Sequence, residues 1–470
     1  MEIKANKQRW MILITVVSAI FMSTLDGSIV NVALPTMSAE LNVSMASVGW
    51  VVTSFLITIV ATILIFGRLG DIKGKAKIFK FGVVVFTLGS LLCGLTDSLP
   101  MLVLARVIQA VGAAATMGTN QGIITQVFPA SERGRALGIL GTAVALGAMA
   151  GPPLGGIIVS AIGWEYIFLI NVPIGIIVFI LTIKIFPKST TALDEKFDGK
   201  GAFLFAAATV LLFAALVQGQ ITGYNNPIMI SAFIISAISF LMFIWVEINN
   251  RLPLLYFKIF SNSLFTISII CAFISFIVIS ASNIILPFYF QNALKLSPAV
   301  TGIFMMVSPI VLSVVAPSSG YLSDKIGSEI LTLFGLIFTS LGLLLISTLN
   351  ETSSVLILTT YIAVMAIGNG MFQSPNNSLV MSTVTKDKLG IAGSINALIR
   401  NLGMVVGTSL STMLLYSKMS EKAGYRVIDY VKGRDDIFIY GMKFVYISAA
   451  VLCAFGAVIT ALRYYSSKKI

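Results

Sequence analysis

Long apolar stretches recur from one end of this chain to the other. A helix that crosses the hydrocarbon core of a membrane needs ~20 consecutive apolar residues, and fourteen stretches approach or exceed that length. The expected spans are 11–34, 46–66, 78–96, 100–124, 136–160, 166–186, 201–218, 227–247, 263–286, 299–319, 330–349, 355–378, 390–416 and 440–463. The chain is 57% hydrophobic and 11% charged, whereas about 25% of a soluble domain is charged. We therefore expect an all-α polytopic membrane protein.

The basic residues indicate how this chain is oriented in the membrane. An even number of spans places both termini on one side. Lys and Arg gather on that side, for example at 4–9, 68–80 and 133–135, whereas the opposite loops before residue 417 hold only Lys295. Cytoplasmic loops carry the excess of basic residues, so both termini are expected in the cytoplasm. The extracellular loop 417–439 mixes both charges. It is either a solvated hairpin or surface helix, or a gate or lid over the outer mouth.

Several function classes are excluded by composition. The chain has no histidine, which removes histidine-based catalysis, metal binding and proton relays. Cys93, Cys271 and Cys453 lie in apolar runs and are expected to be inert buried thiols. The net charge of +12 resides at helix ends, which argues against a nucleic-acid partner. No G-x4-G-K-[ST] phosphate loop occurs, so an ion gradient is the expected energy source and no cofactor or metal is expected.

An internal repeat divides the chain. Residues 67–74 read Gly-Arg-Leu-Gly-Asp-Ile-Lys-Gly, and residues 320–327 read Gly-Tyr-Leu-Ser-Asp-Lys-Ile-Gly. The first copy follows the second span and the second copy follows the tenth. Two six-helix halves with two inserted helices explain that offset. We predict an N-terminal bundle at 1–187, a linker with the inserted helices at 188–260, and a C-terminal bundle at 261–470.

A run of small residues marks the fifth span. It comprises Gly138, Gly147, Gly151, Pro152, Gly155 and Gly156. Glycine is costly inside a helix, but small residues let helices approach closely in lipid, and proline bends them. A face of this kind suits a membrane protein that moves between two states.

These motifs together resemble those of the 14-helix drug:proton antiporters of the major facilitator superfamily, the bacterial efflux pumps of the QacA and EmrB type. The resemblance rests on five motifs in order, at 25–35, 67–77, Arg106-x-x-Gln109, 138–156 and 164–173. It implies the major facilitator fold and identifies the glycine run as the antiporter motif. The span at 51–66 has no carboxylate, unlike some broad-spectrum relatives.

The same resemblance implies a conformational latch at the cytoplasmic loop. Its residues are Gly67, Arg68, Asp71, Gly74 and Lys75, with Asp324 in the second copy. Asp71 is the expected latch acid. A solvated turn is the alternative for both aspartates.

Asp26 is the only acid deep in a span. A charge in the bilayer costs several kcal/mol, so an intramembrane acid is by default a functional hypothesis. At 1.5 Å per residue, Asp26 and Arg106 lie at comparable depths in two neighbouring spans. We expect Asp26 to bind the transported proton and Arg106 to tune it, because burial and a nearby cation act in opposite directions on a carboxyl group. A static ion pair that fixes the two helices is the alternative.

Polar stripes on three spans are expected to line a cavity. Their members are Gln109 and Asn120 with Arg106, then Asn369, Gln373, Asn376 and Asn377, then Asn396 and Arg400. Interhelical hydrogen bonds are the alternative for the amides, whereas Arg400, near the midplane, needs water, an anion or an acid. Asn31, Met117, Met371 and Phe372 are weaker candidates for the substrate cavity, and apolar packing is their alternative.

The favoured function is proton-coupled export of amphipathic drugs and toxic compounds, cationic or neutral, across the bacterial cytoplasmic membrane. We expect alternating access, no enzymatic activity, a monomer, and the lipid bilayer, protons and the small molecule as partners. Export of one native metabolite, peptide or lipid is the first alternative, for which Arg400 would suit an anionic or zwitterionic substrate. A sensor or scaffold without flux and an intramembrane enzyme are more remote alternatives.

Overall fold

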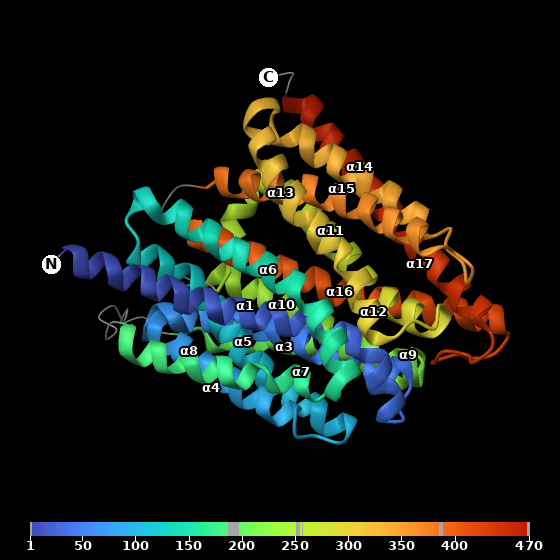
Figure 1. Cartoon of the computed structure of the whole chain (residues 1–470). Coiled ribbons are helices and arrows are strands. Elements are labelled where there is room, and N and C mark those ends of the chain that lie inside the picture. The colour runs from blue at the N-terminus through green and yellow to red at the C-terminus, as the bar shows by residue number, and fades with distance from the viewer. Residues whose placement is uncertain (1, 187–196, 251–253, 256, 385–388, 468–470) are drawn as a thin grey trace. The chain divides into compact units, whose positions relative to one another are not determined.

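The computed structural model describes residues 2–186, 197–250, 254–255, 257–384 and 389–467. Every regular element in these ranges is helical, as lipid requires, because a helix satisfies its own backbone groups. Fourteen of the helical segments are long and apolar enough to span a membrane, which confirms the all-α class and the number of spans (Figure 1).

The first ten helices are α1 (Glu2–Glu40), α2 (Met45–Val48), α3 (Trp50–Lys73), α4 (Lys75–Cys93), α5 (Leu99–Val127), α6 (Ala130–Ile162), α7 (Tyr166–Leu169), α8 (Asn171–Ile185), α9 (Gly199–Thr222) and α10 (Pro227–Asn249). The remaining helices are η1 (Phe257–Ser261), α11 (Ser263–Phe288), η2 (Tyr289–Ala293), α12 (Pro298–Met305), α13 (Val307–Ile326), α14 (Ser328–Ile346), α15 (Val355–Ser382), α16 (Leu389–Ala423) and α17 (Asp435–Ser467).

Three spans that were expected as single helices are interrupted. The second is divided at Gly49 into α2 and α3, the sixth at Ile170 into α7 and α8, and the tenth at Met306 into α12 and α13. A proline follows each of the last two breaks by three residues, Pro173 in one case and Pro309 in the other. Proline has no N–H to donate to the carbonyl four residues earlier, so the helical ladder is broken at both positions.

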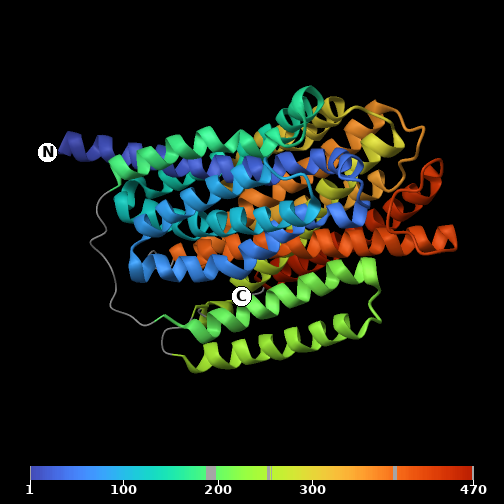
Figure 2. The ribbon, with the colours of Figure 1, turned by 90° about the horizontal axis from the view of Figure 1, so that it is seen from below.

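The backbone contacts divide the chain into two units. Unit 1 is Met1–Ala33, Val48–Gly219 and Gly223–Tyr256, and unit 2 is Leu34–Ser47, Gln220–Thr222 and Phe257–Ile470. The inserted helices α9 and α10 form a hairpin that belongs mainly to unit 1 (Figure 2). Ser236 donates to the Ala208 carbonyl at 2.7 Å. The division into three parts expected from the sequence remains a prediction.

Glycines set how closely the helices of unit 1 pack. A Cβ on Gly112 of α5 would lie 2.2 Å from the Phe86 nitrogen of α4, and a Cβ on Gly89 of α4 would lie 2.5 Å from Gln109 Cα of α5. The two backbones are therefore in direct contact, which only a missing side chain permits. This contact fixes the position of Gln109 against α4.

Unit 2 repeats this packing between α14 and α15. Gly335 and Gly342 of α14 face α15, where their Cβ atoms would lie 2.6 Å from the Phe372 nitrogen and 2.5 Å from Met365 Cα. Figure 1 shows α14 and α15 side by side. The internal repeat therefore extends from the loop motif to the packing of whole helices.

The expected loop 417–439 comprises the end of α16, a shorter connection at residues 424–434 and the start of α17, and its connection makes specific contacts within unit 2. Asp429 accepts from the Met45 N–H at the start of α2, at 3.1 Å. Arg426 donates to the carbonyls of Gln220 and Ile221 at the end of α9, at 2.9 and 2.6 Å. A carboxylate at a helix N-terminus and a guanidinium at a C-terminus both complement the helix dipole. The loop is thus held by two helix ends, and its role as a gate remains a prediction.

Candidate functional site

Asp26 lies in the middle of α1 and is fully buried, with 0% of its surface exposed. Its Oδ2 accepts from Arg106 Nη1 at 2.5 Å. Its Oδ1 accepts from Gln109 Nε2 at 2.8 Å and from Asn171 Nδ2 at 2.9 Å. All four residues belong to unit 1. Three N–H donors around one carboxylate are the pattern of an ionised acid that is removed from water.

Arg106 of α5 is equally enclosed, with 1% exposure. Besides Asp26, it donates from Nε to the Val51 carbonyl at 3.0 Å and from Nη1 to Gln109 Oε1 at 2.6 Å. Its guanidinium carbon lies 4.0 Å from the centre of the Phe55 ring and 5.5 Å from that of Phe168. Aromatic faces stabilise a desolvated cation, so the arginine is held by α1, α3, α5 and α7 together.

Gln109 connects the ion pair to α4. Its Nε2 donates to Ser90 Oγ at 2.8 Å as well as to Asp26, and the Cys93 thiol lies 3.9 Å from its Oε1. Both hydrogens of the amide are therefore used, and its oxygen faces Arg106. The network is closed: moving any one of the three side chains leaves a buried polar group without its partner, which costs about 1–3 kcal/mol.

The structure thus brings together Asp26, Arg106 and Gln109, which the sequence analysis had singled out. It adds Asn171, Ser90, Phe55 and Phe168, which the analysis had not. Asn171 belongs to the motif at 164–173 and begins α8 immediately after the helix break. Ser90, Phe55 and Phe168 had no signal of their own, because small polar and aromatic residues are common in such helices. The motif around Asn171 was the one signal that could have indicated its role.

The antiporter-motif glycines of α6 pack directly on α1. A Cβ on Gly147 would lie 2.9 Å from the Phe21 carbonyl oxygen, and a Cβ on Gly151 would lie 1.8 Å from Ser28 Oγ. Ser28 also donates to the Gly147 carbonyl at 3.2 Å. Gly155 approaches Ile29 in the same way. Gly138, Pro152 and Gly156 lie in the same helix. The motif therefore holds the segment of α1 that contains Asp26.

The loop motif at residues 67–74 packs on the far end of α5. Gly74 has a φ of 96°, a conformation that favours glycine. Asp71 and Lys75 form an ion pair, and the Lys75 side chain crosses Gly122, where a Cβ would lie 2.2 Å from its Cε. These contacts are local to unit 1. Gly67 faces Gly118 of α5, and Arg68 lies half-buried in the last turns of α3. In the second copy of the motif, the side chain of Asp324 is outside the described residues.

The remaining polar candidates are distributed over both units. In unit 1, Asn31 is 7% exposed with no hydrogen bond to its Oδ1, Asn120 is 8% exposed, and Met117 packs against the apolar core around α1 and α5. In unit 2, Asn376 donates to the Ser268 carbonyl at 3.1 Å and Asn396 donates to Asn377 Oδ1 at 2.7 Å. Phe372 is 1% exposed and packed against α14, whereas Met371 is half-buried.

Three further members of the stripes on α15 and α16 have no hydrogen-bond partner among the residues that the structure places. Asn369 is 4% exposed and its Oδ1 is buried without a bond. Gln373 and Arg400 are half-buried. These three side chains are therefore available to a ligand in a way that the saturated Asp26 network is not.

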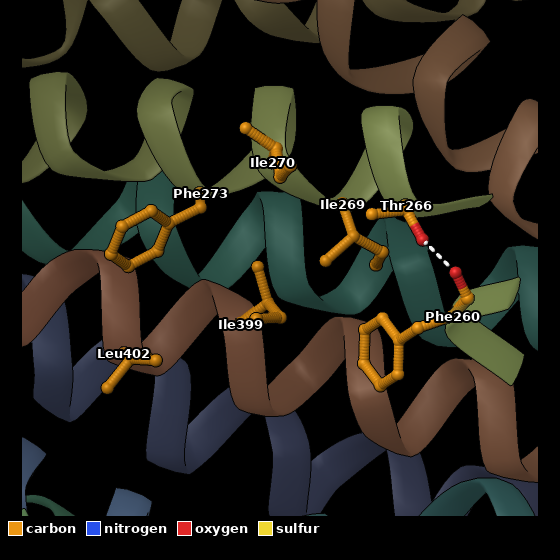
Figure 3. Close-up of a pocket in the computed structure, with 7 residues that line it drawn as sticks. All are labelled: Phe260, Thr266, Ile269, Ile270, Phe273, Ile399 and Leu402. Atoms are coloured by element: carbon orange, nitrogen blue, oxygen red, sulfur yellow. Dashed lines mark hydrogen bonds between the residues drawn. The ribbon is translucent and has the colours of Figure 1, made fainter. Parts of the chain in front are cut away.

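An apolar pocket of about 270 Å³ lies between α11, η1 and α16 in unit 2 (Figure 3). Thr266 is its one polar lining residue, and its hydroxyl is bonded to the Phe260 carbonyl at 2.7 Å. Ligand sites combine apolar walls with a few polar groups that fix orientation, and this pocket offers none. Within the described ranges, no three His, Cys, Asp or Glu side chains gather as a metal site would need.

Comparison with known proteins fits this arrangement. The sequence pattern of the Major Facilitator Superfamily matches residues 16–408 and, in a second match, 269–469. This chain belongs to the Major Facilitator Superfamily. The two overlapping matches agree with the internal repeat of helix packing, since each unit of a superfamily member is a copy of one helical bundle.

Two relatives within the superfamily are similar over most of this chain. The "Riboflavin transporter RibZ" of Clostridioides difficile (strain 630) is 36% identical, over 97% of both chains. The "Multidrug resistance protein Stp" of Mycobacterium tuberculosis (strain ATCC 25618 / H37Rv) is 30% identical, over 88% of this chain and 77% of the relative. A solved superfamily structure, a bacterial homolog of the human lysosomal transporter Spinster in an inward-facing, unoccupied conformation, aligns with a TM-score of 0.67 at 17% identity. It covers 97% of this chain and 96% of that chain, and it shows the shared fold.

Proposed function

We propose that this chain is a proton-coupled antiporter that exports amphipathic small molecules by alternating access. The observation that carries the proposal is the buried network in which Arg106, Gln109 and Asn171 donate to Asp26, an ionisable pair at membrane depth. Buried ion pairs contribute little to stability compared with apolar residues of the same volume. Such a pair in a transporter therefore favours a role in coupling.

In the proposed cycle the proton binds Asp26 when its donors withdraw. In the described geometry three N–H groups donate to the carboxylate, and we assign this arrangement to the proton-free step of the cycle. A shift of α1 against α5 and α8 would separate Asp26 from Arg106, and an unpaired carboxylate in a desolvated site takes up a proton. A proton that crosses ~100 mV releases about 2.3 kcal/mol, which can drive export. A static ion pair between α1 and α5 is the competing interpretation.

The antiporter-motif glycines support this cycle. Gly147 and Gly151 hold α6 against the part of α1 that contains Asp26. Bundle movements in superfamily members are largely rigid-body rocking, and smooth glycine faces permit sliding where interlocked side chains would not. The proposed latch, Asp71 at the end of α3 and Lys75 at the start of α4, packs against α5. Since α5 also contains Arg106 and Gln109, a change at the loop motif would act on the same network.

The names of several relatives support the proposed substrate class. Several relatives are named as multidrug transporters, which supports export of drugs and toxic compounds and membership of the 14-helix drug:proton antiporters. We place the chain in the bacterial cytoplasmic membrane as a monomer without enzymatic activity. Export of one native metabolite is the second candidate, favoured by the 36% identical relative named as a riboflavin transporter.

Flux measurements in proteoliposomes test the proposal. Wild-type protein and Asp26→Asn are reconstituted, a pH gradient is imposed, and movement of N-phenyl-1-naphthylamine and of ethidium is followed by fluorescence. We expect gradient-driven movement with the wild type and none with Asp26→Asn. Full gradient-driven movement with Asp26→Asn would rule out the proton assignment. An absence of flux with either dye and with riboflavin, in a correctly folded wild type, would favour the sensor or scaffold.

A further inference from the structure

Arg400 is a cation at membrane depth without a counter-charge. It lies eleven residues after the start of α16, about 16 Å along the helix at 1.5 Å per residue. Its side chain is half-buried and forms no hydrogen bond or ion pair in the part of the chain that the structure describes. Arg106, at membrane depth in unit 1, has both Asp26 and two aromatic rings. A bare guanidinium within a span is costly and points to function.

The described acids of unit 2 are all engaged elsewhere or lie near the membrane surfaces. Glu329 pairs with Arg463, Glu421 with Lys418, Asp435 with Lys295 and Asp436 with Arg434, while Asp429 caps α2 and Glu40 and Glu351 are exposed near helix ends. None of these described carboxylates forms an ion pair with Arg400. Within the described part of unit 2 its charge is therefore left for a ligand to neutralise.

The register of α15 and α16 places a second donor at the level of Arg400. Asn396 donates to Asn377, which fixes how these antiparallel helices face each other. Residues four apart lie on one face of a helix. Arg400 is four residues after Asn396 on α16, and Gln373 is four residues before Asn377 on α15. The two side chains therefore lie at the same level of this antiparallel pair. Gln373 is also without a partner among the described residues, and Asn369, a further turn along, has a buried Oδ1 without a bond.

We propose that Arg400, with Gln373 beside it, binds an anionic group of the transported compound, such as a sulfonate, carboxylate or phosphate. Arginine is suited to these groups because its planar fork of donors matches their oxygens. Because Arg400 lies ~16 Å from the start of α16, we assign the anionic group to the transported compound and not to a lipid headgroup. This inference rests on the proposed function, and it favours anionic amphiphiles over the cationic ones that the sequence suggested.

The test compares two probes that differ by one charged group. N-phenyl-1-naphthylamine is neutral, and 8-anilino-1-naphthalenesulfonate is the same fluorophore with a sulfonate. Binding to purified protein is measured by equilibrium dialysis without any gradient. We expect the wild type to bind the sulfonate, and Arg400→Gln to weaken that binding by at least tenfold, the loss of a charged hydrogen bond. Affinity for the neutral probe should change less than twofold.

Two further variants keep the test decisive. Arg400→Lys retains the charge without the fork and should bind the sulfonate with intermediate affinity, whereas Lys443→Gln, which removes an exposed cation of α17, should bind like the wild type. Thermal unfolding should show Arg400→Gln to be at least as stable as the wild type, because an unpaired charge is removed. If Arg400→Gln does not fold, Gln373→Leu and Arg400→Lys supply the comparison.

Three outcomes would overturn the inference: no sulfonate binding by the wild type, unchanged sulfonate binding by Arg400→Gln, or an equal loss of both probes. Because no gradient is present, these outcomes are independent of proton coupling. If the neutral probe shows gradient-driven flux but the protein does not bind the sulfonate through Arg400, this inference is rejected and the antiporter proposal stands. If Arg400 binds the sulfonate selectively but no gradient-driven flux occurs, the antiporter proposal is rejected and this inference stands.

Discussion

Arg106 Nη1 lies 2.5 Å from Asp26 Oδ2, and the two side chains are 1% and 0% exposed. Asp26 therefore depends on Arg106, Gln109 and Asn171 for the polar contacts that water would otherwise provide. Arg106 depends in the same way on Asp26, Gln109 and the Val51 carbonyl. Removing one partner of a buried pair leaves an uncompensated charge and typically costs about 3–5 kcal/mol. This interdependence leads to the predictions below.

Neutralising only the arginine should destabilise the protein more than neutralising both residues. We expect Arg106→Gln to lower the free energy of unfolding by about 3–5 kcal/mol, and the double variant Asp26→Asn with Arg106→Gln to recover much of that loss. Thermal and denaturant unfolding in detergent would measure the coupling as a double-mutant cycle. Additive losses would show that the two side chains act independently, against the described contact.

Asn171 is predicted to be a positioning residue for Asp26. Asn171→Ala removes one of three donors and should cost about 1–3 kcal/mol of stability, together with a loss of gradient-driven flux. The matched control is Asn249→Ala, because the exposed Asn249 amide bonds only to its own helix. Its flux and unfolding midpoint should equal those of the wild type. Normal flux with Asn171→Ala would remove Asn171 from the site.

The contact between α6 and α1 predicts opposite effects for two glycines of one helix. Gly151→Ala places a methyl group against Ser28 and Ile29, and overpacking of this kind costs about 1–3 kcal/mol. Gly141→Ala meets nothing within 4 Å and should stabilise the helix by up to about 1 kcal/mol. Unfolding midpoints and flux are measured for both variants. Equal midpoints would contradict the close packing of α6 on α1.

The contacts of the loop 417–439 predict a modest contribution to stability. Asp429→Ala removes the acceptor of the Met45 N–H and should cost about 0.5–1.5 kcal/mol, as the loss of one hydrogen bond does. It should also speed proteolytic cleavage of the loop. Lys432→Ala, an exposed residue of the same loop, is the control and should behave like the wild type. Cleavage at the same rate in both variants would show that Asp429 does not hold the loop.

Much of the fold was predictable because lipid imposes a simple rule. Each span must be helical and apolar, so hydropathy alone located all fourteen. Asp26 and Arg106 stood out for the same reason, since charges are rare at that depth. The helix breaks at Ile170 and Met306 follow from Pro173 and Pro309, but proline at other positions in this chain, such as Pro35, lies within a continuous helix, so the sequence did not single them out.

The rest of the site depends on packing between helices that are distant in sequence. Asn171 and Ser90 reach the ion pair only because α4, α5 and α8 meet around α1, and neither residue type is unusual in a span. The repeat makes this clear: Ser282 and Met365 of unit 2 occupy the positions of Asp26 and Gln109, and Ser282 Oγ lies 3.5 Å from Met365 Sδ. The helix packing of unit 1 is therefore repeated in unit 2, whereas the buried charges are not. The repeat alone thus does not reveal which unit contains the ion pair.

The most direct test of proton binding at Asp26 is proton release on ligand binding. The purified protein is placed in weakly buffered detergent solution, N-phenyl-1-naphthylamine is added at saturation, and the change in pH is recorded with an indicator dye. The account predicts that ligand binding shifts the wild type toward the described state, in which three donors saturate Asp26, so that protons are released. Asp26→Asn, with unchanged ligand binding, should release none. Equal proton release by the two proteins would contradict it.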